Sequence, residues 1–165
     1  MLFRSAGKLN LKQGGPGVIV PADPELVHLL YKPSQWKVNP NVNEHDRRSV
    51  YLIAKRNLRL PFAEAFDQPD AQTSCPRREQ STHALQALEL LNGRLANALA
   101  ESLALRLRRE AGPDPACQVE LAYRLAAGRA PTPREKELAV RFLKAQPLRE
   151  FALAVINLNA FLYVS

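Results

Sequence analysis

The feature that most constrains the fold is an apolar stripe with the spacing of a helix in the second half of the chain. Four leucines recur at every fourth position, so they lie on one face of a helix predicted from Gly93 to about Arg109. Because such a face must be buried, this helix requires other helices to pack against it. The four leucines are Leu95, Leu99, Leu103 and Leu107.

Two further helices are predicted from a capping side chain followed by proline, which suits the first helical position. Asp114-Pro115 starts a helix that runs to about Ala127, and Thr132-Pro133 starts another close behind it. We expect these two to form an antiparallel hairpin, because only a short link separates them. The core face of the second helix is predicted to consist of Leu138, Phe142 and Ala145.

Shorter helical segments complete a mainly α prediction. They span Pro24 to about Tyr31, Pro61 to Phe66, His83 to Leu91 and Pro147 to about Asn159, and a helix end is expected near Gly7. Hydrophobic residues make up 46% of the chain and charged residues 24%, as in ordinary soluble domains. The expected architecture is a compact multi-helix bundle with short antiparallel helical hairpins.

Residues 47–56 break the helical pattern and are predicted to form a strand. Val50 and Leu52 alternate with Tyr51 and Ile53, so the two pairs point to opposite faces. Since an isolated strand needs a partner, we expect a minor strand or two-stranded ribbon that pairs near residues 18–20. Trp36, in the irregular segment before it, is expected to pack on the core.

The 165 residues suit a single domain with three parts. Residues 1–46 form a loop-rich lead-in, residues 47–82 hold the strand and an arginine-rich loop, and residues 83–165 form the helical bundle.

The densest group of charged side chains lies between residues 47 and 78. One interpretation is an anion-binding site, in which arginine forks grip carboxylate or phosphate. The other interpretation, which we favour because acids and bases are intermixed, is a structural ion-pair network. In this network, Arg56 or Arg59 pairs with Asp67 or Asp70. The candidate residues are Arg47, Arg48, Arg56, Arg59, Asp67, Asp70, Arg77 and Arg78.

We assign no catalytic and no metal-binding residues. The histidines are far apart, at His28, His45 and His83, and none has a metal-ligand spacing to a cysteine or an acid. Cys75 and Cys117 are too few for a disulfide framework. The spacing allows one bridge between them but does not require it, and we favour two free, mostly buried thiols. The chain has no CxxCH motif, so covalent c-type haem attachment to it is excluded.

The formal net charge is +7, which suits solubility and is also found in nucleic-acid binders. Because the basic residues are spread along the chain without a block, we regard nucleic acid as an unlikely partner. No apolar stretch has the roughly 18 residues that a membrane span needs. Residues 1–10 lack the apolar core of a signal peptide, so the chain taken alone is expected to be cytoplasmic.

A series of motifs in fixed order gives a more specific indication. In this combination, the motifs resemble the C-terminal domain of exported planctomycete and acidobacterial proteins. That family is domain-of-unknown-function family 1553, also called PSD1. The resemblance also includes two earlier segments, SAGKLN (5–10) and GGPG (14–17). The motifs are RRSVY (47–51), KRN (55–57), FDQPD (66–70), SCPRR (74–78), LLN (90–92), AYRLAAGRAPTPRE (122–135) and NLNAFLYV (157–164).

The resemblance implies that the chain is the C-terminal portion of a larger exported protein, periplasmic or extracellular, with a cytochrome-c-like haem domain upstream. The chain itself is then expected to carry no cofactor and to have the upstream domains as its partners. The leading hypothesis is a non-catalytic structural or interaction domain. The alternatives are a binding module for acidic polysaccharide or another polyanion, and a carbohydrate-active hydrolase that uses Asp67 and Asp70. Glu79 and Gln80 depart from the apolar residues usual in the family at that place.

Overall fold

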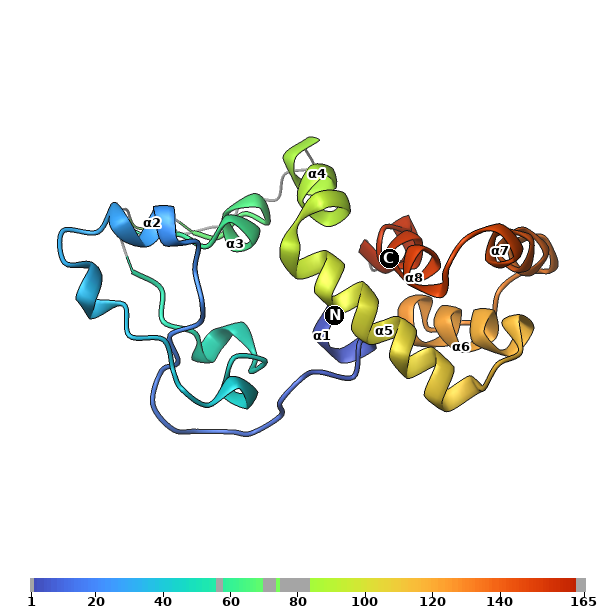
Figure 1. The fold of residues 1–165 in the computed structure, drawn as a ribbon, viewed down its shortest axis with the longest axis horizontal. Helices are drawn as coiled ribbons and strands as arrows, with labels where there is room; N and C mark the ends of the chain where they lie inside the picture. The colour runs from blue at the N-terminus through green and yellow to red at the C-terminus, as the bar shows by residue number, and fades with distance from the viewer. Residues whose placement is uncertain (1, 56–57, 70–73, 75–83, 163–165) are drawn as a thin grey trace. The chain divides into compact units, whose positions relative to one another are not determined.

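The computed structural model of the protein describes residues 2–55, 58–69, 74 and 84–162, and it is mainly helical. The chain divides into two compact units (Figure 1). Unit 1 consists of residues 1–8 and 87–165, and unit 2 of residues 9–86. The predicted start of the helical bundle, at residue 83, lies close to this division. The prediction of a single domain stays a prediction.

Unit 1 is built around the long helix α5 (Arg94–Ala111). The most extensive packing in this unit is between α5 and α8 (Leu148–Ile156), and α6 (Pro115–Ala127) contacts both of them. The short C-terminal helix α9 (Asn159–Leu162) packs on α6 and α8 through the buried Phe161. The predicted leucine stripe is confirmed, since Leu99, Leu103 and Leu107 are buried and Leu95 is half-buried.

The predicted starts at Asp114 and Thr132 and the stop at Gly128 are also confirmed. The predicted ends near Tyr31 and Asn159 are wrong, because α2 (Pro24–His28) ends at His28 and α8 ends at Ile156. The Asp114 carboxylate accepts a hydrogen bond from the Ala116 backbone N–H at 3.2 Å, which caps α6, and Gly128 ends the helix in the left-handed conformation with φ 69°. The helix α7 (Pro133–Ala145) begins with a reciprocal capping box between Thr132 and Glu135. The helices α6 and α7 pack together as the expected hairpin.

The helix α1 (Leu2–Ser5) ends where a glycine was expected to stop it, with Gly7 at φ 72°. The Arg106 guanidinium donates hydrogen bonds to the carbonyls of Arg4 and Ser5 at 3.1 and 2.9 Å. The Ser5 hydroxyl donates to the Leu125 carbonyl at 3.0 Å. These polar contacts hold the first residues of the chain on α5 and α6.

The predicted core face of α7 is wrong. Leu138 is 46% exposed and Phe142 38% exposed, and Ala145 is exposed as well. The helix instead buries Ala139, with Leu143 half-buried beside it. Both arcs of α7 are apolar, so the spacing alone did not determine which arc faces the core.

The described residues of unit 2 contain little regular structure. They form the helices α2 (Pro24–His28) and α3 (Pro61–Ala65), with 3-10 helices at Pro33–Gln35, Val42–Glu44 and Ser49–Tyr51. The helix α4 (Ala84–Asn92) spans the boundary between the two units.

The core of unit 2 is a small cluster of Leu30, Trp36 and Leu58. The Trp36 indole N–H donates to the Val20 carbonyl at 3.1 Å, as suits a buried tryptophan. The expected role of Trp36 as a core residue is confirmed.

The expected strand at residues 47–56 is largely wrong, because a 3-10 helix occupies its middle. The described residues form isolated β-bridges here, and one of them joins Leu52 to the predicted partner Val18. There, the Val18 N–H donates to the Tyr51 carbonyl and the Ile53 N–H donates to the Val18 carbonyl, both at 2.8 Å. A strand would separate Arg47 from Tyr51 by about 13 Å along its axis. The turn brings their side chains together instead.

Candidate functional site

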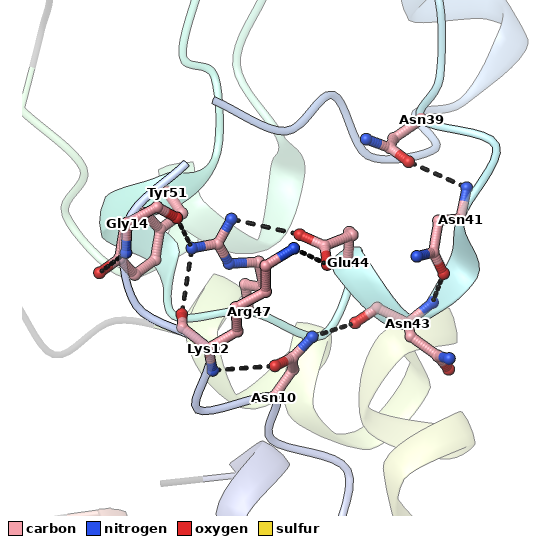
Figure 2. A network of polar contacts seen from close by, with 9 residues as sticks. All are labelled: Asn10, Lys12, Gly14, Asn39, Asn41, Asn43, Glu44, Arg47 and Tyr51. Carbon is pink, nitrogen blue, oxygen red and sulfur yellow. Dashed lines mark hydrogen bonds and ion pairs between the residues drawn. The ribbon is translucent and has the colours of Figure 1, made fainter. Parts of the chain in front are cut away.

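Arg47, the first residue of the RRSVY motif, is a buried charge at the centre of a polar network in unit 2 (Figure 2). Its side chain is only 1% exposed, and its guanidinium Nη1 lies 3.2 Å from Glu44 Oε2. Its Nη2 donates to the backbone carbonyls of Lys12, at 3.0 Å, and Gly14. The guanidinium also lies over the Tyr51 ring, 3.9 Å from its centroid. The arginine thus ties residues 12–14 to residues 44–51 of unit 2.

A series of asparagine side chains shapes the segment that presents Glu44. Asn39 Oδ1 accepts from the Asn41 N–H at 2.9 Å, and Asn41 Oδ1 accepts from the Asn43 N–H at 3.1 Å. Such bonds to the backbone two residues ahead favour tight turns over helix or strand. Asn10 joins this segment to the loop that contains Lys12, because Asn10 Nδ2 donates to the Asn43 carbonyl at 2.8 Å. Its Oδ1 also accepts from the Lys12 N–H at 2.9 Å.

The glycine-rich segment 14–17 wraps over the guanidinium. Gly14 and Gly15 have φ values of 70° and 89°, a region that side chains with a Cβ rarely adopt. The Gly14 N–H donates to the Tyr51 hydroxyl at 3.2 Å, so the ring contacts Arg47 through its face and this loop through its oxygen. The positive φ values of residues 14 and 15 explain why both of them are glycines.

Glu44 is the anionic partner of two cations. Lys12 Nζ lies 2.9 Å from Glu44 Oε1, while Arg47 holds the other carboxylate oxygen. The hydrogen bond from Lys12 is the largest cause that keeps the pKa of Glu44 below its usual value, and the charges of Lys12 and Arg47 act in the same direction. Both terminal nitrogens of Arg47 are therefore bonded within the protein. Arg47 Nε is buried and has no hydrogen-bond partner in the described part of the chain. This geometry is that of a structural clasp.

The other candidate residues are placed only in part. Arg48, next to Arg47 in the chain, is exposed and has no ion pair among the residues that the structure describes. Arg59 Nη1 lies 3.7 Å from Glu64 Oε1, so an arginine–acid contact exists, with Glu64 as a partner that was not anticipated. Asp67 is half-buried and has a positive φ of 55°.

Four candidates, Arg56, Asp70, Arg77 and Arg78, lie outside the described residues, as does Cys75. The prediction that the eight candidates form one network therefore stays a prediction.

Three residues of the clasp were not identified from sequence, namely Lys12, Glu44 and Tyr51. The four-residue spacing of Arg47 and Tyr51 was the available signal, because residues four apart meet on a helical turn. The alternating pattern of residues 50–53 indicated a strand instead.

Cys117 is a free thiol, as predicted, but it is exposed and the expectation of a buried side chain is wrong for it. It lies in the first turn of α6, and the nearby Asp114 carboxylate raises the pKa of the thiol through a hydrogen bond and its charge. A raised pKa makes this thiol less reactive.

Neither a cluster of metal ligands nor a membrane-spanning helix is present among the described residues. Across residues 2–55, 58–69, 74 and 84–162, no group of three or more histidine, cysteine or acidic side chains is placed to hold a metal ion. Within the same part of the chain, no helix has the length and apolar character that crossing a bilayer demands.

Comparison with known proteins gives one match. The family described as "PSD1: Protein of unknown function (DUF1553)" matches residues 1–143. No curated protein and no solved structure matches the chain.

Proposed function

Since the chain belongs to the PSD1 family of proteins of unknown function, we propose that it is a non-catalytic interaction domain that packs against a partner domain. The observation that carries this proposal is the pair of large apolar side chains on α7, Leu138 and Phe142, which unit 1 leaves at the surface. Single exposed leucines are common, whereas apolar side chains that adjoin on one helix face form a patch, which is the usual basis of an interaction surface.

The use of Arg47 supports the same proposal. A catalytic or anion-binding arginine needs free donors that face a ligand, whereas the terminal donors of Arg47 bond to Glu44 and to backbone carbonyls. The best-defined polar constellation of the described chain therefore stabilises its own fold.

The proposed partner is an exported cytochrome-c-like domain of the same or a neighbouring polypeptide. In this arrangement, the haem belongs to the partner, and the chain contributes no cofactor ligand. Its role is to cover and position the partner domain.

This proposal is tested by co-expression of the chain with the polypeptide encoded directly upstream of it. We expect one complex of defined stoichiometry, measured by size-exclusion chromatography with light scattering. Two components that elute separately at micromolar concentrations would contradict the proposal. The Leu105→Ser variant serves as a control for nonspecific hydrophobic association, because Leu105 is an exposed leucine on a different helix.

Binding of an acidic polysaccharide is a second candidate function. It is favoured by Arg48, an exposed cation without an ion pair in the described residues. Retention of the chain on immobilised heparin that falls steeply with salt, and that weakens in Arg48→Gln, would support this candidate. Equal retention of the wild type and Arg48→Gln would contradict a role for Arg48.

A further inference from the structure

The outward face of α7 has an apolar stripe that runs along much of the helix. Leu138, Phe142 and Ala145 are all exposed, at spacings of four and three residues that place them on one side of the helix. The opposite arc, which includes Ala139, faces the interior of unit 1, where α7 packs against α6 and α8. The stripe is therefore a second apolar face of α7, which the described residues of unit 1 leave exposed.

Unpaired positive charge lies directly beside this stripe. Arg134 precedes Leu138 by four positions and Arg141 follows it by three, so both border Leu138 on the helix surface. Both arginines are exposed, and neither has an ion pair among the residues that the structure describes. Glu137 follows Arg134 by three positions and precedes Arg141 by four, so it borders both arginines, and the positive charge of Lys144 offsets it.

The nearest acid on the other side of the stripe is already neutralised. The Glu135 carboxylate accepts hydrogen bonds from both terminal nitrogens of Arg129, at 2.7 and 2.8 Å, and from the Thr132 N–H at 2.7 Å. The net field beside the stripe therefore comes from Arg134 and Arg141 and is positive.

We infer that the α7 face formed by Arg134, Leu138, Arg141, Phe142 and Ala145 docks an acidic amphipathic helix of a partner protein. The apolar residues of that helix would cover Leu138 and Phe142, and its carboxylates would pair with the two arginines. From Arg134 to Ala145 the face is about 16 Å long, which matches a partner helix of about three turns. This inference rests on the proposed interaction function and specifies the chemistry of the partner.

The charge pattern argues against two other occupants. A second copy that docked through the same face would bring Arg134 and Arg141 of both copies together, which is repulsive. A membrane surface requires a broad apolar arc on the helix, whereas the inner arc of α7 is already packed against α6 and α8.

The test uses the full chain and a fluorescent synthetic helical peptide of about 18 residues, with leucines at helical spacing and glutamates on both flanks. Binding is measured by fluorescence anisotropy at low salt. We expect saturable binding that weakens about tenfold or more when lysines replace the glutamates, since the arginines then repel the probe. Equal binding of both peptides would overturn the inference.

Variants of the chain test whether the peptide binds to α7. Leu138→Ser with Phe142→Ser, and separately Arg134→Glu with Arg141→Glu, should each weaken binding of the acidic peptide about tenfold or more. Leu105→Ser is the matched control and should bind as the wild type does. Circular dichroism checks that every variant keeps its helix content. A folded double variant with wild-type affinity would overturn the inference.

Two further outcomes separate this inference from the proposed function. A stable complex with the upstream polypeptide that Leu138→Ser with Phe142→Ser leaves unchanged would refute the α7 face and leave the interaction function intact. Binding of the acidic peptide without any complex would support the α7 face and refute the proposed partner. Binding to vesicles of anionic lipid, with no binding to the peptide, would replace the protein partner with a membrane and overturn the inference.

Discussion

Different interactions stabilise the interior of each of the two units of the molecule. In unit 1, long helices bury continuous apolar stripes, and fully buried residues such as Leu103 and Leu107 fill the space between them. In unit 2, the apolar cluster around Trp36 is small, and a buried arginine joins separate loops by hydrogen bonds. The difference shows that a charged side chain can take over, in a loop-rich segment, the organising role that apolar packing has in a helical one.

The largest expected effect is the loss of the Arg47 clasp. Arg47→Met removes its hydrogen bonds and the pairing to Glu44, and we expect unit 2 to lose about 4 kcal/mol of its free energy of unfolding. Urea unfolding followed by tryptophan fluorescence measures this, because Trp36 is the only tryptophan and lies in unit 2. The neighbouring variant Arg48→Met should change stability by no more than about 0.5 kcal/mol. Similar losses for both variants would contradict the clasp.

The corresponding change in unit 1 is a truncation in its core. Leu103 is 1% exposed, and Leu103→Ala should cost about 3 kcal/mol through lost burial and the cavity left behind. Thermal unfolding followed by circular dichroism measures the loss. Leu105→Ala, on the same helix but at a position that is 58% exposed, is the control and should be nearly neutral. The packing account of unit 1 fails if Leu105→Ala costs as much as Leu103→Ala.

A smaller effect is expected at the start of α7. Thr132→Ala removes the hydroxyl that accepts from the Glu135 N–H at 3.3 Å, and the loss of such a cap costs about 1 kcal/mol. Urea unfolding measured by circular dichroism detects it. Thr132→Ser keeps the hydroxyl and should retain most of the stability. A Thr132→Ser variant as unstable as Thr132→Ala would argue against the cap.

The smallest effect is a pH dependence at the same position. Hydrogen bonds from Arg129, and next from the Thr132 backbone, lower the pKa of Glu135 from 4.5 to about 2. A carboxylate with a lowered pKa in the folded state contributes stability above its unfolded pKa, and this contribution is lost as the pH falls from about 4.5 towards 2. Glu135→Gln should therefore flatten the stability profile of unit 1 in this range. An unchanged profile in the variant would contradict the assignment.

Sequence reasoning succeeded where the determining signals are local. The caps at Asp114 and Thr132 and the stop at Gly128 act within one helical turn, and the α5 stripe has a clear period. It failed for the orientation of α7, because both of its arcs are apolar and only the neighbouring helices decide which is buried. Three-dimensional packing, which the chain order does not encode locally, supplies that information.

The clasp was partly missed for a related reason. Lys12 and Glu44 are 32 positions apart in sequence, and no short pattern links them to Arg47. The alternation of apolar side chains at residues 50–53 also favoured a strand, whereas the stacking of Arg47 on Tyr51 requires a turn there.

The central claim is that Arg47 serves as the scaffold of unit 2, and amide hydrogen exchange tests it most directly. Arg47→Gln is compared with Arg48→Gln and the wild type, residue by residue. We predict much faster exchange of the bridging amides of Val18 and Ile53 in Arg47→Gln alone, with the amides of Leu103 and Leu107 unchanged. Wild-type protection of Val18 and Ile53 in Arg47→Gln would contradict the claim.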